Sequence, residues 1–451
     1  MGSTPFTRTY TALNQMILSG FIFIFEIEMK LKTLFSSILL LSVISLFAKE
    51  YNPAKEAWLQ DNLLRAGINT CPYEFEPLYD TPAPKGFHPF YISHYGRHGS
   101  RSDWGRKDYS KVISVLSKAK DQQILTKEGY SLLSVSRKVM EMTDGMDGRL
   151  SRRGAIEHQR LAERMYRRYN QVFKKGNGHI RSISSYVPRC LISMNAFTAS
   201  LASLNKNLTF YWDAGEKFQK YISNDCPKSL KPDIKALTDS IKNSFVVDTV
   251  YYINRLFTDY NKASKLVGNK RDFQWNIFRT LKITGAFDID TDLFNILPID
   301  FICQCEQYQS SRLYMGHCNS VEYGKQVTAE AKPLLADIVD KADEVIATGS
   351  VCSDLRFGHD YTVLSLSSLM GLEGVGQRLR CSEIATRWFG ARYTPFAANI
   401  QIIFYRNSKN DILVKFLLNE KETLLLGLAP KYGPYYGWND VRKYFKDVIA
   451  L

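Results

Sequence analysis

Residues 96–101 (GRHGSR) bring together residue types that can carry out phosphoryl chemistry. Two arginines, Arg97 and Arg101, flank His98, and the interspersed glycines let the backbone come close to a ligand. A neutral imidazole can attack phosphorus, and planar guanidinium groups suit the oxygens of a phosphoryl group. The segment therefore predicts a site in which His98 is a nucleophile and two arginines hold its anionic target.

A third arginine stands at the start of an expected helix. Pro188 favours the first turn of a helix over residues 188–204, and Arg189 follows it at once. A cation at a helix N-terminus opposes the macrodipole, at a cost of about 0.3–1 kcal/mol. An anion shared between the guanidinium and the helix end removes that conflict, so we expect Arg189 to face an anionic ligand.

His359 and Asp360 come directly before a helix that we expect over residues 361–370. The carboxyl group of Asp360 can protonate an oxygen that leaves phosphorus. Each residue also has an ordinary structural role, because aspartate is a common helix cap and a lone histidine is usually structural. The combination with the arginines is what favours a catalytic set.

Three strands must position these turns. β-branched and aromatic runs predict strands over residues 89–95, 180–186 and 345–357, each ending at or close to the start of one of the turns. Residues 399–405 and 412–418, separated by the turn NSKN, predict a hairpin. Since open α/β sheets bind ligands at the carboxyl ends of their strands, we expect the three turns to meet around one point.

Strand–helix alternation at both ends of the chain, with long helical patterns between, predicts an α/β fold. We expect a mixed, mainly parallel sheet flanked by helices, with a mostly helical cap domain inserted. The α/β core would comprise residues 49–214 and 341–451, and the cap residues 215–340.

Two further histidines have structural interpretations. An amphipathic helix opened by Ser151 is expected over residues 150–169, and His158 within it is interpreted as exposed or bonded locally. His94 is interpreted as a packed histidine of the first strand.

Residues 97–101 (RHGSR) resemble the RHGxR signature of the histidine acid phosphatases, branch 2 of the histidine phosphatase superfamily, and residues 359–360 resemble their HD element. The segment around Arg189 is similar to the family's third-arginine turn. The roles that the resemblance implies are phosphoryl acceptor for His98, proton donor for Asp360, and phosphate binding for Arg97, Arg101, Arg189 and His359. It implies no metal or other cofactor, because the arginines take that electrostatic role.

Charge bears on which phosphate ester the site would take. Lys and Arg number 59 against 45 Asp and Glu, a net charge of +14, and Arg106, Lys107 and Arg356 lie beside the signature segments as possible substrate-binding residues. This excess favours a polyanion, and the chain resembles phytases and multiple inositol polyphosphate phosphatases. The latter branch often has HAE where this chain has HDY, so a sugar phosphatase or a broad-specificity acid phosphatase are alternatives, as is a non-catalytic phosphate-ester-binding relative.

Residues 29–48 have the form of a signal peptide. The basic segment MKLK precedes an uncharged apolar run, LFSSILLLSVISLFA, which is too short to span a bilayer comfortably. We therefore expect export to the periplasm or the exterior, and no stable membrane insertion once residues 1–48 are removed. Residues 1–28 precede the basic segment and are expected to be a mis-annotated extension, with translation starting at Met29.

Composition narrows the remaining classes. Hydrophobic residues make up 45% and charged residues 23%, which excludes global disorder, and the single apolar stretch excludes a polytopic membrane protein. The eight cysteines could form disulfides after export, and the cluster of Cys303, Cys305, His317 and Cys318 matches no standard zinc spacing. No nucleic-acid reading element is evident. The expected partner is a phosphorylated, polyanionic small molecule; the sequence does not indicate an oligomeric state.

Overall fold

The computed structural model describes residues 52–175 and 177–451. Tyr51–Lys242 and Val246–Leu451 form one compact unit, which carries the features discussed below. The expected signal peptide and the extension before it lie outside the described residues.

A mixed sheet forms the centre of this unit. Its strands in the described part of the chain are β1 (His88–Arg97), β2 (His179–Ser184), β3 (Thr209–Asp213), β4 (Ser353–Gly358), β5 (Asn399–Arg406), β6 (Ile412–Leu418), β7 (Lys421–Thr423) and β8 (Tyr435–Gly437). Their order is β3-β2-β4-β1-β5-β6-β7, and β8 pairs with β6. The strands from β3 to β1 are parallel, whereas β5 to β8 pair antiparallel with their neighbours.

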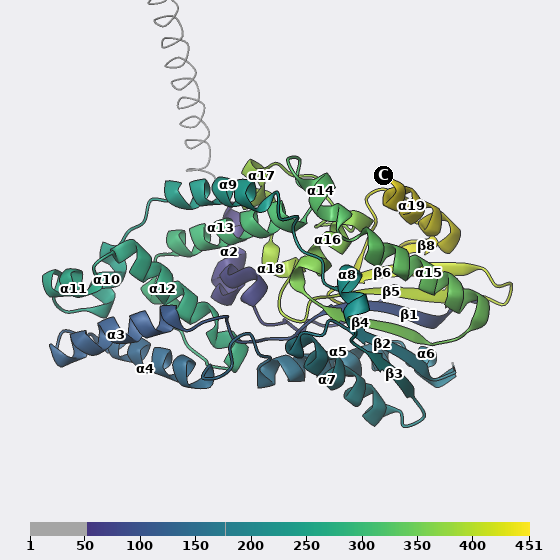
Figure 1. Cartoon of the computed structure of the whole chain (residues 1–451), viewed down its shortest axis with the longest axis horizontal. Helices are drawn as coiled ribbons and strands as arrows, with labels where there is room; N and C mark the ends of the chain where they lie inside the picture. Colours follow the sequence, from purple (N-terminus) through teal and green to yellow (C-terminus); the bar gives the residue numbers. More distant parts are fainter. Residues whose placement is uncertain (1–51, 176) are drawn as a thin grey trace, which may run out of the picture. The chain divides into compact units, whose positions relative to one another are not determined.

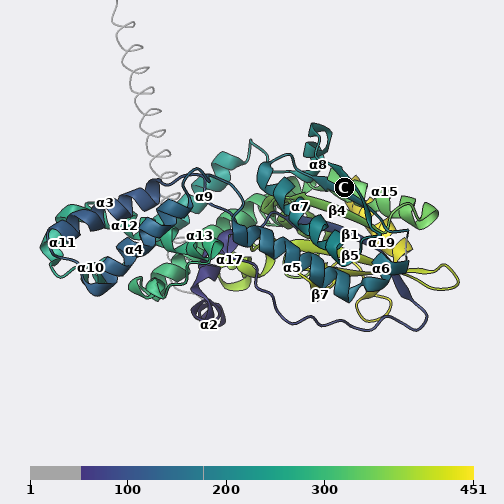
Figure 2. The same ribbon diagram turned by 90° about the horizontal axis from the view of Figure 1, so that it is seen from below.

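Helices cover both faces of the sheet (Figures 1 and 2). One face carries α5 (Arg152–Arg168), α6 (Asn170–Lys175) and α7 (Pro188–Leu204). The other carries α15 (Lys332–Thr348), α16 (Asp360–Met370) and α19 (Trp438–Ala450). The predicted α/β class, a mixed sheet flanked by helices, is thus confirmed.

The remaining helices and 3₁₀ segments do not belong to these two groups, and many of them contribute to a second apolar core. They are α2 (Pro53–Asp61), the 3₁₀ segment η1 (Leu63–Thr70), α3 (Lys107–Asp121), α4 (Lys127–Met142), η2 (Glu216–Phe218), α8 (Gln219–Ile222), α9 (Lys231–Ser244), α10 (Val250–Leu256), α11 (Tyr260–Val267), α12 (Lys270–Lys282), η3 (Thr284–Phe287), η4 (Leu293–Ile296), α13 (Ile299–His317), α14 (Gly324–Ala329), α17 (Cys381–Arg387) and α18 (Gly390–Tyr393). The stretch expected as a helical cap, residues 215–340, lies mostly in this group. Helices α3 and α4 precede that stretch, yet they pack against α10, α11 and α12.

Local sequence signals set several boundaries. The Ser151 side chain accepts a hydrogen bond from the Gly154 backbone N at 3.2 Å and opens α5, as the sequence predicts. The strand expected over residues 345–357 begins later than predicted. Helix α15 continues to Thr348 and ends at Gly349, whose φ of 64° is a left-handed conformation that glycine adopts without strain.

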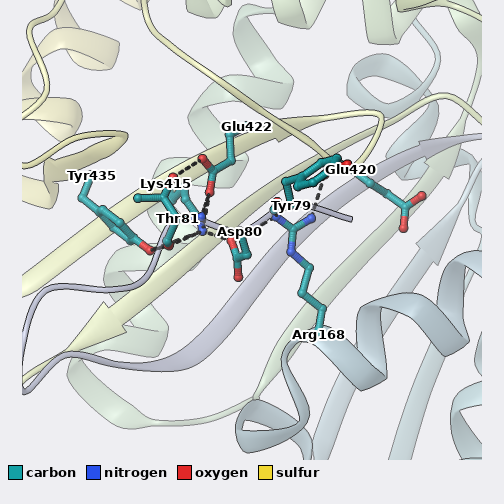
Figure 3. Close-up of polar contacts among 8 residues, drawn as sticks. All are labelled: Tyr79, Asp80, Thr81, Arg168, Lys415, Glu420, Glu422 and Tyr435. Atoms are coloured by element: carbon teal, nitrogen blue, oxygen red, sulfur yellow. Dashed lines mark hydrogen bonds and ion pairs between the residues drawn. The ribbon is translucent and has the colours of Figure 1, made fainter. Parts of the chain in front are cut away.

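An extended segment before β1 is held against the sheet by ion pairs to two buried cations, Lys415 and Arg168 (Figure 3). Lys415 on β6 is fully buried and contacts the carboxylates of Asp80 and Glu422, the latter at 2.9 Å. Glu422 also accepts a hydrogen bond from the Thr81 backbone N at 2.8 Å. Arg168 of α5 lies 3.0 Å from Asp80 on the other side. These contacts hold the segment against β6 and α5, so β1 enters the sheet from a fixed position.

None of the helices in the described part of the chain has the length and apolar character needed to cross a bilayer. All eight cysteines are buried.

Candidate active site

The register of three parallel strands brings the three turns to one edge of the sheet. Arg97, the last residue of β1, pairs with Gly358 at the end of β4, and Ser184 at the end of β2 pairs with Phe357. Because β4 lies between β1 and β2, the turns that follow these strands are neighbours although they are far apart in the sequence.

The two histidines of the site face one another. The ring centroids of His98 and His359 are 5.8 Å apart, with the ring planes at 73°. The His98 backbone N donates a hydrogen bond to the Gly358 carbonyl at 2.9 Å, which joins the first and third turns. Arg189 brings in the second turn, since its Nη2 lies 3.2 Å from His359 Nδ1.

Asp360 occupies the same site beside Arg97. The Arg97 Nη2 and the Asp360 Oδ2 are 3.4 Å apart, and the Asn69 amide donates a hydrogen bond to the same oxygen at 2.7 Å. Arg97 is itself oriented by the Thr394 carbonyl at 3.1 Å and by the Phe396 ring, whose centroid lies 4.6 Å from the guanidinium carbon. Both contacts to Asp360 fall on Oδ2.

The arginines retain unused hydrogen-bond donors. Among the described residues, the Nε atoms of Arg97, Arg101 and Arg189 are buried and have no hydrogen-bond partner. Over the same residues, Arg101 and Arg189 form no ion pair with a carboxylate. A buried unsatisfied donor costs about 1–3 kcal/mol, so the arrangement suits an anion bound between these groups.

Burial and the arginines set the charge state of the histidines. Burial, reinforced by the charges of Arg97, Arg101 and Arg189, holds the pKa of His98 well below its ordinary value. Burial likewise lowers the pKa of His359 to about 4, with Arg189 adding to the effect. Both imidazoles are therefore neutral in mildly acidic solution.

The carboxyl group of Asp360 is subject to opposing effects. Burial would raise the pKa of Asp360, but the Arg97 cation and the Asn69 amide outweigh it and hold that pKa below its ordinary value. Without an anion in the site, Asp360 is ionised. A bound phosphate would oppose the arginine charges and favour its protonation.

The loop after His98 is packed so closely against α5 that only glycine fits. A Cβ on Gly99 would lie 2.3 Å from the Gly154 carbonyl oxygen, and one on Gly154 would lie 2.2 Å from the Ser100 carbonyl oxygen. The buried Glu157 accepts hydrogen bonds from the Ser100 backbone N and Oγ, each at 2.7 Å. Helix α5 thereby fixes the loop that presents His98.

The comparison with protein families decides the identity of this fold. The family model described as "Histidine phosphatase superfamily (branch 2)" matches residues 96–419, more than two thirds of the chain. The chain belongs to this family. It is therefore a phosphatase, and the resemblance inferred from the RHGSR and HD motifs is confirmed.

Solved structures share the fold of this chain. The multiple inositol polyphosphate phosphatase of Bifidobacterium longum, in complex with inositol hexasulfate, has a TM-score of 0.63 and 18% sequence identity, covering 84% of this chain and 97% of that one. The phytase from D. castellii has a TM-score of 0.62 and 14% identity, covering 87% and 86% of the two chains. At these identities the likeness concerns the fold. No curated protein sequence matches the chain.

The three residues expected to bind substrate differ in their exposure and in their ion pairs. Lys107 is exposed at the start of α3, and Arg106 beside it forms an ion pair with Asp144. Arg356 is only 2% exposed and pairs with Asp337 of α15 at 2.8 Å. The substrate-binding role expected for Arg356 does not fit this placement, because its charge is neutralised inside the fold.

Several residues at the site were not predicted from the sequence. Asn69 holds Asp360, Glu157 braces the loop, and Trp104 lies against Arg101 and Arg189. No short motif marks them, because each acts through a contact between distant segments or through an exposed ring.

The interpretation of His158 as exposed or locally bonded was wrong, whereas His94 is packed as expected. Both imidazoles are buried against the rings of Phe197 and Phe357, directly beneath the site. Burial lowers the pKa of each to about 3.

Histidine, cysteine and carboxylate side chains do not gather into a group of three suited to a metal ion anywhere in residues 52–175 and 177–451. The cluster of Cys303, Cys305, His317 and Cys318 noted in the sequence thus forms no such group among these residues. His317 instead stacks on the Tyr361 ring at a centroid distance of 4.1 Å.

Proposed function

We propose that this phosphatase hydrolyses phosphate monoesters through a phosphohistidine at His98, and that its natural substrates are inositol polyphosphates such as phytate. The observation that carries the proposal is the meeting of a neutral imidazole, three arginines with unused donors and one carboxyl group at a single sheet edge.

The nucleophilic atom follows from the hydrogen bond of the other ring nitrogen. His98 Nδ1 lies 2.9 Å from the Gly99 carbonyl, so Nδ1 carries the proton and Nε2 has the free electron pair. In the first step Nε2 forms a bond to phosphorus as the bond from phosphorus to the ester oxygen breaks. Asp360 gives its proton to the departing oxygen, from Oδ1, since Asn69 and Arg97 contact Oδ2.

In the second step water attacks the phosphohistidine. Asp360, now a carboxylate, accepts a proton from that water as the new oxygen–phosphorus bond forms, and the electron pair of the breaking nitrogen–phosphorus bond returns to Nε2 of His98. Arg97, Arg101 and Arg189 offset the negative charge of the phosphoryl oxygens in both steps. No further ion is needed for this charge balance.

The polyanionic substrate is proposed from charge and from analogy. The net charge of +14 favours polyanions at the surface. One similar structure holds inositol hexasulfate, which imitates a fully phosphorylated inositol. A sugar phosphatase or broad-specificity acid phosphatase is the alternative, since the inner site recognises a single phosphoryl group.

We further propose that the enzyme is exported, with residues 1–48 removed. The apolar run over residues 34–48 supports this. Sequencing the N-terminus of the protein from its native cells tests it; a mature protein that retains residues 29–48 would contradict it.

Activity is tested on the purified enzyme with EDTA, across pH 4–8, against phytate, glucose 1-phosphate and p-nitrophenyl phosphate. We expect hydrolysis to survive EDTA, and to disappear in His98→Ala while an exposed-histidine control, His179→Ala, is unaffected. Rapid quenching should trap an acid-labile, base-stable phosphoenzyme in the wild type and none in His98→Ala. Activity in His98→Ala, or a dependence on added metal, would overturn the mechanism. A kcat/KM for phytate below that for glucose 1-phosphate would favour the sugar phosphatase.

A further inference from the structure

Trp104 lies against two of the arginines that the proposed function assigns to phosphate. The guanidinium carbon of Arg189 is 5.1 Å from the centroid of the Trp104 ring, and that of Arg101 is 5.5 Å away. Trp104 is 65% exposed, whereas Arg189 is only 8% exposed. A large aromatic ring thus remains at the surface although it contacts two charged groups of the site.

The two arginines need a partner because they repel each other. Burial lowers the pKa of Arg189, and the neighbouring Arg101 cation lowers it further. Within residues 52–175 and 177–451, neither arginine forms an ion pair with a carboxylate. The Asp360 carboxylate lies beside Arg97 instead. The negative face of an indole attracts guanidinium groups within about 6 Å, and tryptophan does so best of the aromatic residues.

The ring is also held in place by the backbone around it. A Cβ on Gly148 would lie 2.7 Å from the Trp104 ring, so the ring packs directly on that glycine. The Gly148 backbone N donates to the Asp103 carbonyl at 3.0 Å, and the Ser102 backbone N donates to the Arg149 carbonyl at 3.1 Å. The loop before α5 therefore fixes the segment that carries Trp104.

We propose that Trp104 is a positioning residue that holds Arg101 and Arg189 together, ready to clamp a phosphate group, before substrate arrives. Its contribution is made through the arginines: it lowers the cost of keeping two like charges close together and limits their side-chain freedom. The inference rests on the proposed function, because it takes Arg101 and Arg189 to bind phosphate.

Two substitutions at Trp104 separate the π face from simple bulk. Trp104→Leu keeps an apolar side chain and removes the aromatic face, whereas Trp104→Phe retains a weaker one. With p-nitrophenyl phosphate as substrate and inorganic phosphate as inhibitor, we expect Trp104→Leu to raise both KM and Ki by about 5–30-fold. We expect kcat to fall by a smaller factor than KM rises, because the arginines also act in the chemical steps while His98 and Asp360 are untouched. Trp104→Phe should recover most of the lost affinity.

Trp212, which is 54% exposed on β3, provides the matched control. Trp212→Leu should leave KM, Ki and kcat unchanged. Adding inorganic phosphate should change the tryptophan emission of the wild type and of Trp212→Leu, but not that of Trp104→Phe. Thermal unfolding of each variant checks that the fold is intact.

The outcomes distinguish the two proposals. If the wild type neither binds phosphate nor hydrolyses the ester, the proposed function fails. If the wild type does both and Trp104→Leu has the wild-type Ki, or if Leu and Phe lower phosphate affinity equally, only the role of Trp104 is overturned.

Discussion

His94 and His158 are buried among aromatic rings beneath the site, and they should make the fold sensitive to acid. Burial lowers the pKa of each to about 3, whereas an unfolded chain binds these protons near pH ~6.5. Below that pH the unfolded state binds more protons than the folded state. The free energy of unfolding therefore decreases as the pH falls from about 6.5 towards 3.

The size of this effect follows from the two pKa values. Each histidine removes about 1.4 kcal/mol of stability per pH unit in this interval, so acidification from pH 7 to pH 5 costs about 2 kcal/mol for each. The pair together costs about 4 kcal/mol, a large fraction of the roughly 5–15 kcal/mol that stabilises a typical domain. Unfolding, rather than the chemistry of the site, should then set the acid limit of activity.

His158→Leu isolates one of these histidines. Leucine suits the contacts with Phe197 and Phe357, and any change in packing affects stability equally at both pH values, so it cancels in the difference. Urea unfolding followed by circular dichroism at pH 7 and pH 5 should show the variant losing about 2 kcal/mol less than the wild type. His88→Leu, which replaces an exposed histidine, should lose as much as the wild type.

Identical losses in His158→Leu and the wild type would refute this reasoning. They would mean that the imidazole reaches water, or a partner that keeps its proton, without unfolding of the chain.

Three other perturbations test separate parts of the structure. Asn69→Ala removes a hydrogen-bond donor that helps to lower the pKa of Asp360, so the alkaline limb of the kcat/KM profile for phytate should move to higher pH. The profile for p-nitrophenyl phosphate should change little, because its leaving group needs no proton. A shift of the phytate profile to lower pH would contradict this. Lys415→Met leaves Glu422 without its cation and Asp80 with Arg168 alone; because both carboxylates are partly exposed, we expect a cost of about 1–3 kcal/mol in urea unfolding, and an unchanged free energy of unfolding would show that the carboxylates reach water. Gly99→Ala would place a methyl group 2.3 Å from the Gly154 carbonyl and should lower kcat at least about 100-fold with the chain still folded by circular dichroism; near-normal kcat would mean that the loop shifts freely.

Most of the site could be predicted because its signals are local. The strands that precede the turns bearing His98, Arg189 and His359 are marked by apolar runs, and because ligands bind at the carboxyl ends of parallel strands, these turns could be expected to meet. The start of α5 could also be predicted, because a serine cap depends on neighbouring residues alone.

Side-chain direction was harder to predict. Arg356 lies on β4, where successive side chains point to opposite faces, and a sequence does not say which face carries the site. Its partner Asp337 comes from a helix on the far side of the sheet from α5. For His158 the information was present: Gly154, Glu157 and Leu161 repeat at helical spacing on the buried face, and His158 falls among them.

Contacts between distant segments left no signal in the sequence. Asn69 reaches Asp360 from η1, where the backbone turns sharply at Ile68 with a φ of 48°. Trp104 meets Arg189 only because the second and first turns are adjacent. Such pairings depend on the whole fold, and no residue pattern within either segment marks them.

The central place of β4 has a consequence for when the enzyme first becomes active. β1 and β2 leave the ribosome early, but the strand that must sit between them is made only at residues 353–358. A nascent chain or a proteolytic fragment that stops before this point has no partner to align the two earlier strands, and it lacks His359 and Asp360 as well. Phosphatase activity is therefore expected only from chains that extend beyond Asp360.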